Sequence, residues 1–476
     1  MACLGFALLT TSAAAQTIEP IYSFTNSGFS SPRNPHADLI LGGDGNFYGT
    51  TENGGSGGFG TVFRVTTSGA LTVLANFDSF NTGGDPYGGV MLGPDGNLYG
   101  TTYFSGPGGV GTVFRVTTDG VLTRLYSFSR MGWTGSYYTN NDGGYPYAGL
   151  ALGPDGCLYG ATSGGGSNGS GTLFKITTNG VLTTTLFSFS ALSGSPPTNT
   201  TGARPYARLT LGPDGNFYGT TFLGGTKGDG TVFRVTTDGA FTVLVNFVGT
   251  NGVGPQGALT VGPDSSLYGT TVNGGIYGDT GTVFKMTTNG VLTTLVSFDF
   301  NTGAAPGAGV TLGPDGNFYG TTSVGSSSGT DSWGTVFRVT TNGVLTTLAN
   351  FSNTNGSLPE AGVTLGPDGN FYGTAFVGGS DDPNAAGGVI YRLNLGLTLT
   401  NRPPSISISR SAGGAVMLNL ASETGSTNRL WVTTNLSLPM PQWQVLATIV
   451  ATNGSFEFTD TNTSANQMRF YRLSTP

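Results

Sequence analysis

The chain is poor in charge, in histidine and in cysteine. Only 9% of its 476 residues are charged, with 18 Lys and Arg against 25 Asp and Glu, for a net charge of -7. This acidic balance gives no electrostatic footprint for nucleic acid or for an anionic membrane surface. With one histidine and two cysteines, a Ser-His-Asp or Cys-His enzyme would depend on that single histidine, and no nucleophile motif accompanies it.

Long hydrophobic runs are absent too, apart from a short one at the amino terminus. The first sixteen residues, MACLGFALLTTSAAAQ, combine an apolar stretch with a small-residue cleavage pattern after Ala15. We expect residues 1–15 to be a signal peptide, although no positive charge precedes the apolar stretch. Cys3 would leave with it, so Cys157 has no partner for a disulfide. The expected localisation is secreted or cell-surface, without a membrane span.

Helical periodicity is missing, whereas glycine and β-forming residues are abundant. The sequence holds 83 Gly, 24 Pro, 30 Phe and 19 Tyr. Glycine at this level without a triplet period excludes collagen, and a hydrophobic content of 37% argues against disorder. Abundant Thr, Val, Phe and Tyr therefore predict an all-β protein with many tight turns.

One pattern, LGPDGNLYGTT at residues 92–102, occurs in seven versions at intervals typical of a propeller. Each unit contains four strand-length segments, such as GGVML, NLYGTT, GTVFRVTT and VLTRLYSF, joined by turn signals. In GPDG, Pro, Asp and Gly suit the successive positions of a tight turn. The aspartates of the seven copies are Asp44, Asp95, Asp155, Asp214, Asp264, Asp315 and Asp368.

The fourth strand of the unit is displaced in one copy. The TTxG turn and the strand after it follow the third strand only six times, and a seventh equivalent strand, IEPIYSF, stands at Ile18 to Phe24. An amino-terminal strand that completes the last blade would close a ring and protect its edges. We therefore predict a seven-bladed β-propeller over residues 16–399, with Ile18 to Phe24 as the outermost strand of blade seven.

The repeat resembles two known propeller-type repeats. Its DGNLY core with the following Phe-Arg strand resembles the NHL-type repeat, and GPDGNFYGTT…GTVFRVTTNGVLTTL is similar to the GloVer tandem repeat of secreted bacterial proteins. The second resemblance covers most of the chain. It implies a secreted or surface-displayed protein and leaves the biochemical role undefined.

The repeat pattern stops after NRPP. Six strand-like segments, from SISISR to MRFYRLS, predict a separate small β-sandwich over residues 403–476 that is similar to fibronectin-III-like end modules. Trp431 and Trp443 are expected to belong to its core rather than to a ligand platform.

The repeated motif itself is predicted to be scaffold. Packing of similar blades requires the same residues at equivalent positions, whereas a binding site is usually asymmetric. Each repeated Asp should cap its own turn, and each repeated Tyr should occupy a core-like strand position. The basic residue of GTVFR should pair between blades or cover apolar surface with its stem. Function is then expected on the variable loops of the opposite face.

Each inter-blade loop ends in Pro, one variable residue, and Ala or Gly. The small residue is expected where blades converge on the axis, which places the variable residue at the channel mouth. Two positions further on, five copies carry Gly or Ala, and the other two carry Asp38 and Arg208. The variable residues are His36, Tyr87, Tyr147, Tyr206, Gln256, Gly307 and Glu360.

Aromatic, amide and charged groups of this kind are typical of a glycan or peptide surface. The longest inter-blade loop adds further rings, including Tyr145, near the mouth. Two plainer interpretations stay open: solvated turn residues, or rings that pack on one another to hold the loop. The candidate ligand-binding residues are Tyr87, Tyr147, Tyr206, Gln256, Arg208, Trp133, Tyr137 and Tyr138.

A smaller group could carry chemistry. His36, Asp38, Glu52 and Glu360 are expected to approach one another where blade seven meets blade one, as an acid–base group or a metal site. A second histidine is lacking, so neither a catalytic residue nor a metal is assigned. No cofactor is expected: DDPNAAGG and TKGDG could hold Ca²⁺, but neither matches a known ligand spacing.

The sequence thus favours a secreted, non-enzymatic binding or scaffold propeller that recognises carbohydrate or peptide of the cell envelope. The alternatives are a carbohydrate-active hydrolase or lyase that uses the blade seven–blade one corner, and a purely structural envelope protein. No nucleic-acid partner is expected, and the oligomeric state stays open.

Overall fold

Strands dominate the computed structural model, which describes residues 16–325, 333–380 and 386–395 together with six strands between Ser405 and Ser474. In these residues, the one helix is a short 3-10 turn, Gly249–Asn251. The chain forms two units, of which the larger spans Ala13–Gly396. The all-β prediction is confirmed, whereas the predicted signal peptide lies outside the described residues.

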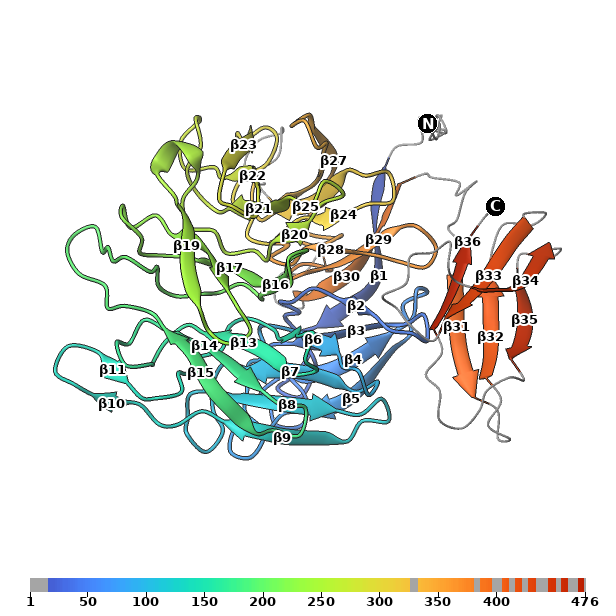
Figure 1. The fold of residues 1–476 in the computed structure, drawn as a ribbon, viewed down its shortest axis with the longest axis horizontal. Coiled ribbons are helices and arrows are strands. Elements are labelled where there is room, and N and C mark those ends of the chain that lie inside the picture. The colour runs from blue at the N-terminus through green and yellow to red at the C-terminus, as the bar shows by residue number, and fades with distance from the viewer. Residues whose placement is uncertain are drawn as a thin grey trace. The chain divides into compact units, whose positions relative to one another are not determined.

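The larger unit consists of seven antiparallel four-stranded sheets, which are the blades of a propeller (Figure 1). In every blade the first strand is short and lies nearest the axis. The blades, in order, are β2 (Ile40–Leu41), β3 (Phe47–Thr51), β4 (Thr61–Val65) and β5 (Leu71–Asn76); β6 (Val90–Leu92), β7 (Leu98–Thr102), β8 (Thr112–Val116) and β9 (Leu122–Ser127); β12 (Ala151–Leu152), β13 (Leu158–Thr162), β14 (Thr172–Ile176) and β15 (Leu182–Ser188); β16 (Thr210–Leu211), β17 (Phe217–Thr221), β18 (Thr231–Val235) and β19 (Phe241–Asn246); β20 (Thr260–Val261), β21 (Leu267–Thr271), β22 (Thr282–Met286) and β23 (Leu292–Ser297); β24 (Thr311–Leu312), β25 (Phe318–Thr322), β26 (Thr335–Val339) and β27 (Leu345–Asn350); β28 (Val363–Leu365), β29 (Phe371–Ala375), β30 (Ala386–Asn394) and β1 (Thr17–Thr25).

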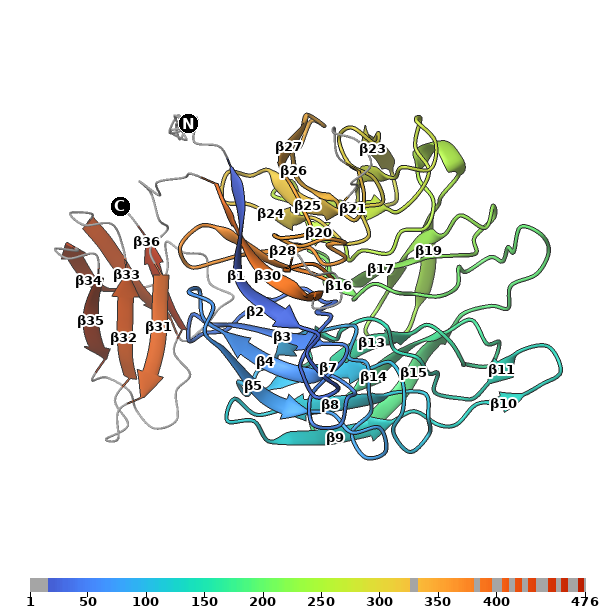
Figure 2. The same ribbon diagram turned by 180° about the vertical axis from the view of Figure 1, so that it is seen from behind.

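Blade seven closes the ring with the amino-terminal strand, as predicted. Strand β1 pairs antiparallel with β30 from Thr17 opposite Asn394 to Thr25 opposite Ala386, and the two strands lie side by side in both views (Figures 1 and 2). The side chains of Ile18 and Phe24 are buried. Every blade therefore has its full set of four strands, and the ring edge at β30 is covered.

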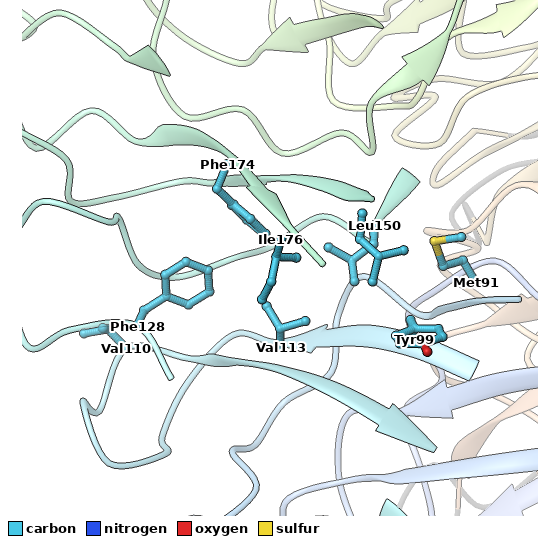
Figure 3. Close-up of a cluster of buried hydrophobic side chains, with 9 residues drawn as sticks. Met91, Tyr99, Val110, Val113, Phe128, Leu150, Phe174 and Ile176 are labelled. Carbon is cyan, nitrogen blue, oxygen red and sulfur yellow. The ribbon is translucent and has the colours of Figure 1, made fainter. Parts of the chain in front are cut away.

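Apolar side chains between neighbouring blades form the core. The second strand of every blade is buried along its whole length, and in blades one to six the third strand is buried except at its basic residue, because each blade packs against a neighbour on both faces. Figure 3 shows one such layer between blades two and three, where the rings of Phe128 and Phe174 meet edge to face at 5.2 Å. Close packing of this kind supplies most of the stability.

The repeated aspartate and tyrosine form one structural unit, which confirms their prediction as scaffold. In blade two, Asp95 Oδ1 accepts a hydrogen bond from the Asn97 amide at 3.1 Å, and Asp95 Oδ2 accepts one from the Tyr99 hydroxyl at 2.7 Å. The same tyrosine-to-aspartate bond occurs in all seven blades. Where serine replaces the turn glycine, Ser265 still adopts a positive φ of 62°, so the turn geometry is kept.

Of the two roles predicted for the repeated basic residues, pairing between blades was wrong for the two lysines. Lys175 and Lys285 reach the turn aspartates of their own blades, with Nζ–Oδ2 distances of 2.6 Å to Asp155 and Asp264. The reason is register: Lys175 lies directly opposite Tyr159, whose hydroxyl already binds the same aspartate. A lysine at this position therefore neutralises the carboxylate charge of the turn aspartate in its own blade.

Beyond the propeller, six strands form two antiparallel three-stranded sheets, in the orders β31-β32-β35 and β34-β33-β36. Trp431 lies on β33, and Trp443 lies outside the described residues. The strands are β31 (Ser405–Arg410), β32 (Val416–Ala421), β33 (Thr427–Thr433), β34 (Gln444–Val450), β35 (Ser455–Asp460) and β36 (Phe470–Ser474).

Candidate functional site

One face of the propeller carries the inter-blade loops and the loops between the second and third strands of each blade. We call it the variable face, because the turns of the other face repeat almost unchanged. On the variable face, the residue before each inter-blade proline has a left-handed backbone, including Asp85 with φ 57° and Arg204 with φ 55°. Such a conformation is costly for a residue with a side chain and persists only where its surroundings fix it.

Backbone hydrogen bonds fix these left-handed residues from two sides. The amide of Asp85 donates to the Phe59 carbonyl of the preceding blade at 3.1 Å, and the Asp85 carbonyl accepts from the Tyr103 amide of its own blade at 3.0 Å. Equivalent pairs of bonds recur at the other blades. Each inter-blade loop is therefore held rigidly where it enters the channel mouth.

The seven variable residues that follow the prolines all line one cavity of about 110 Å³ at the axis. The sequence predicted that these residues lie together because the blades converge at the axis, and the structure shows that convergence. A Cβ at Gly88 would come within 2.3 Å of the Gly149 backbone, and one at Gly309 would come within 2.2 Å of the Ala258 carbonyl oxygen. Whether the seven bind a ligand stays a prediction.

The axial convergence can be tested with two neighbouring glycines of blade six. Gly309→Ala is expected to lower the free energy of unfolding by about 1–3 kcal/mol, because its methyl group would overlap backbone that has no room to move. Gly307→Ala is the control, since a Cβ there meets nothing closer than Ser323 Oγ at 3.8 Å. Equal denaturant midpoints for the two variants would contradict the packing described here.

Three tyrosines form a continuous wall along one side of the mouth. The rings of Tyr87 and Tyr147 stack at 5.1 Å, and those of Tyr147 and Tyr206 lie 4.8 Å apart. Two residues that sequence reasoning missed extend this wall. Tyr103 contacts Tyr87 at 5.2 Å, and Phe222 contacts Tyr206 at 5.4 Å. Both directly follow the repeated second strand, so an alignment of the seven repeats would have shown the position to be variable.

His36 connects the tyrosine wall to blade seven. Its Nε2 lies 2.8 Å from Glu360 Oε2 and 3.0 Å from the Tyr147 hydroxyl oxygen. A carboxylate only accepts hydrogen bonds, so Nε2 carries the hydrogen. The Tyr147 hydroxyl hydrogen is then left for another acceptor. Burial and the Glu360 carboxylate raise the pKa of Tyr147, which keeps this hydroxyl protonated and able to donate to a ligand.

The other two acidic candidates contact different partners. Asp38 Oδ1 accepts a hydrogen bond from the Gly362 amide at 2.6 Å, so Asp38 joins blade one to blade seven. Glu52 Oε1 accepts from the Tyr87 hydroxyl at 3.2 Å. The expected cluster of four thus resolves into one pair, His36 with Glu360, and two acids with separate roles.

The described residues contain no group of three or more His, Cys, Asp and Glu side chains placed to hold a metal ion. Of the two segments considered for Ca²⁺, the acidic residues of DDPNAAGG lie outside the described residues. In TKGDG, Asp229 Oδ2 accepts a hydrogen bond from the Gly249 amide at 3.1 Å. That carboxylate therefore already has a structural partner.

Asp85 is a third residue that sequence reasoning missed. Burial and the nearby Glu52 carboxylate raise its pKa to about 6. The folded protein therefore binds this proton more tightly than the unfolded chain, whose Asp pKa is about 3.9. The contribution of Asp85 to stability consequently falls as the pH rises from about 4 to about 6.

Asp85→Asn is expected to remove this pH dependence. Its free energy of unfolding, relative to the wild type, should increase from pH 4 to pH 7, because the wild type must then hold a second carboxylate charge beside Glu52. Denaturant titrations across that range would measure the difference. Asp279→Asn is the control at an exposed site on the same face, and the same pH trend in both variants would refute the assignment to Asp85.

Two polar side chains at the mouth are free to bind. Arg208 and Gln256 line the cavity, and neither makes a hydrogen bond or ion pair with any residue that the structure describes. The ring position of Arg208 is occupied by Gly or Ala in five other blades, so its guanidinium stands alone on that side of the channel. Asp38 of blade one occupies the same position of the repeat as Arg208 of blade four.

The remaining aromatic candidates lie elsewhere. Trp133 is on β10 (Gly132–Trp133) and Tyr138 on β11 (Tyr138–Thr139), which form a hairpin in the longest inter-blade loop. This hairpin projects from the rim of the propeller (Figures 1 and 2). Tyr137 lies in its turn. No ring contact joins these three residues to the tyrosine wall within the described structure, so they are not part of the mouth as the sequence suggested. Tyr145 is beside it, 5.4 Å from Tyr103.

Comparisons with solved structures give likenesses of low sequence identity. Solved structures with a similar fold include a candidate 6-phosphogluconolactonase from Bacteroides uniformis (17% identity, 76% of this chain and 98% of the other, TM-score 0.47). An ulvan lyase (12%, 80% and 96%, 0.46) and an α-L-arabinanase from Penicillium chrysogenum (12%, 69% and 99%, 0.39) are also similar. Likenesses of this size say nothing about activity.

No curated protein matches the sequence significantly. Among the described residues, no helix is long and apolar enough to cross a membrane. The family model of the Gloeobacter/Verrucomicrobia repeat matches residues 7–201, 196–382 and 280–438, and so covers most of the chain in three overlapping stretches.

Proposed function

The chain belongs to the Gloeobacter/Verrucomicrobia repeat family, and on that premise we propose that it is a non-enzymatic binding propeller that recognises carbohydrate at the axial mouth of its variable face. The tyrosine wall, Tyr87, Tyr147 and Tyr206, is the observation that carries this proposal. Flat aromatic faces beside unpaired hydrogen-bonding groups suit sugar rings, which offer apolar C–H faces and hydroxyl edges.

Polar groups around the wall supply the specificity. Arg208 and Gln256 have unused donors, Gln256 also has an acceptor, and the Tyr147 hydroxyl has a hydrogen to give. The cavity of about 110 Å³ is smaller than the roughly 300–1,000 Å³ of ordinary small-molecule sites. It accommodates one substituent or the end of a ligand, while the body of the ligand lies against the tyrosines outside.

A carbohydrate-active hydrolase or lyase is the second candidate. The contacts of His36 Nε2 with Glu360 and Tyr147 favour it, because a histidine oriented by a carboxylate beside a protonated tyrosine is a usable acid–base pair. Asp38 lines the axial cavity with Glu360, but binding is preferred because Asp38 is held by the Gly362 amide and Glu52 by the Tyr87 hydroxyl. A purely structural envelope role is the third candidate.

The rest of the proposal concerns location and domains. Residues 1–15 act as a signal peptide, 16–399 form the propeller, and 403–476 form a fibronectin-III-like β-sandwich from the two three-stranded sheets. The secreted or surface-displayed protein then meets a glycan, or a glycosylated protein, of the cell envelope. The cleavage pattern after Ala15 supports secretion.

A glycan array with the chain from Gln16 onward tests the proposal, and incubation of every hit with the protein, followed by product analysis, separates binding from catalysis. We expect hits and unchanged glycans. Cleaved glycans would establish the hydrolase or lyase instead. Binding only to peptide arrays would move the ligand class to peptide, and no ligand on either array would favour the structural role.

A further inference from the structure

The position of the rim hairpin β10–β11 indicates the shape of the ligand that the proposed function requires. Resting on that function, we propose that the ligand is a linear oligosaccharide. One end sits at the axial mouth, and the chain runs outward along the boundary of blades two and three to a second subsite beneath the hairpin. The second subsite is built from Trp133, Tyr138, Tyr145 and Arg130.

A pocket of about 440 Å³ lies beneath the hairpin. Its size falls within the range of ordinary ligand sites, unlike the axial cavity. Tyr138 and Tyr145 line it with Arg130 and Met131, and the glycine-rich loop of blade two, residues 106–110, forms the opposite wall. The amides of Gly106, Gly108 and Gly109 on that wall already donate hydrogen bonds within the protein, so the rings on the other side are the main contact surface of the pocket.

The base of the hairpin loop is fixed by polar contacts. Asp142 Oδ2 accepts hydrogen bonds from the Tyr126 hydroxyl at 2.6 Å and from the Ser129 amide at 2.9 Å. Asn140 Nδ2 donates to the carbonyls of Ser129 and Gly143, both at 2.7 Å. A loop anchored in this way presents its tip at a set position, which lowers the entropic cost of binding.

The tip itself is open to solvent. Trp133 is 59% exposed and Tyr138 is 58% exposed, although their rings lie 4.9 Å apart across the hairpin. They therefore touch one another without belonging to the core. Large aromatic side chains that stay exposed on an anchored loop are typical of recognition surfaces.

Aromatic rings join the rim pocket to the mouth. Tyr145 lines the pocket and contacts Tyr103 at 5.4 Å, and Tyr103 contacts Tyr87 at 5.2 Å and Tyr147 at 5.9 Å. A row of similar faces suits a chain of similar units, and sugar residues provide that. Because the axial cavity ends the row, the end of the chain is expected there.

Backbone hydrogen bonding along this row disfavours an extended peptide. The amide of Asp85 donates to a carbonyl of blade one, and the amides of Tyr103 and Tyr145 donate to carbonyls of blade two and of the loop before it. These three amides are therefore not available to pair with a peptide, which removes part of the usual source of affinity for an extended peptide. Side-chain faces dominate the surface, and they favour the glycan.

A chain-length series tests the inference. Cello-, xylo- and chito-oligosaccharides from disaccharide to hexasaccharide are titrated calorimetrically into the wild type and into the double variant Trp133→Ala/Tyr138→Ala. For the series that binds, we expect affinity to rise about tenfold or more with length in the wild type. The double variant should bind the disaccharide as the wild type does and lose that gain. The control is Ile276→Ala/Tyr277→Ala, two exposed residues on a blade-five loop of the same face.

The outcomes separate the two proposals. Wild-type affinity that is the same for disaccharide and hexasaccharide, or a gain that survives in the hairpin variant, would overturn the second subsite and leave the axial site standing. A gain lost equally in the control variant would also overturn it. Absence of binding by every series at every length would count against the proposed function itself.

Discussion

A chain that begins at Thr25 is expected to lose about 5 kcal/mol or more of its free energy of unfolding relative to one that begins at Gln16. The deletion removes the buried Ile18 and Phe24 and uncovers the edge of β30. Truncation of one large buried side chain alone costs about 2–5 kcal/mol, and a typical protein has only about 5–15 kcal/mol in total. Denaturant unfolding followed by near-ultraviolet circular dichroism measures the loss.

Phe24→Ala isolates the packing part of this effect, because the strand and its pairing with β30 stay in place. Its expected cost is about 3–5 kcal/mol, since the Phe24 ring packs against Phe63 of blade one at 5.7 Å. The exposed Phe80 is the control, and its alanine variant should stay within about 0.5 kcal/mol of the wild type. If the Thr25 chain unfolds within about 1 kcal/mol of the Gln16 chain, the closure contributes little.

Tyr206→Ala is expected to weaken binding of the best glycan on the array by about thirtyfold or more, which corresponds to about 2 kcal/mol. Tyr206 ends the tyrosine wall, is only partly buried, and its hydroxyl makes no hydrogen bond with any described residue. Its ring is therefore available to a ligand. Isothermal titration calorimetry gives the affinity, and thermal unfolding shows whether the fold persists.

Tyr277→Ala is the matched control for this variant. Tyr277 is a tyrosine on the same face, 63% exposed, on blade five and outside the aromatic cluster. It should leave the affinity unchanged, while the melting temperatures of the two variants should differ by only a few degrees. Unchanged affinity together with a large drop in melting temperature for Tyr206→Ala would identify the wall as loop packing, which was the plainer interpretation of these rings.

The fold was predictable because the same strand and turn pattern occurs in every blade. Seven copies of the turn motif with six copies of the fourth strand were enough to predict the number of blades and the position of β1. The axial residues followed from one steric argument about small residues such as Gly88 and Gly257, and the structure gathers all seven around one cavity.

The details of the site depended on three-dimensional contacts that the repeat pattern does not predict. Tyr103 and Phe222 follow a strand whose register alone decides that they face the mouth. Asp85 owes its raised pKa to burial and to Glu52, which lies 33 positions earlier in the chain. Trp133 and Tyr138 were expected beside the mouth because their loop ends there. Instead, the β10–β11 hairpin places them at the rim. The length of the loop does not predict the direction in which it projects.

A crystal structure of the propeller with the best array glycan tests the central claim most directly. The account predicts that a sugar ring lies against Tyr147 or Tyr206, with polar contacts to Arg208 or Gln256, and that no glycan is bound on the opposite face. A glycan bound only among the GPDG and TTxG turns, where the seven blades are nearly identical, would contradict it.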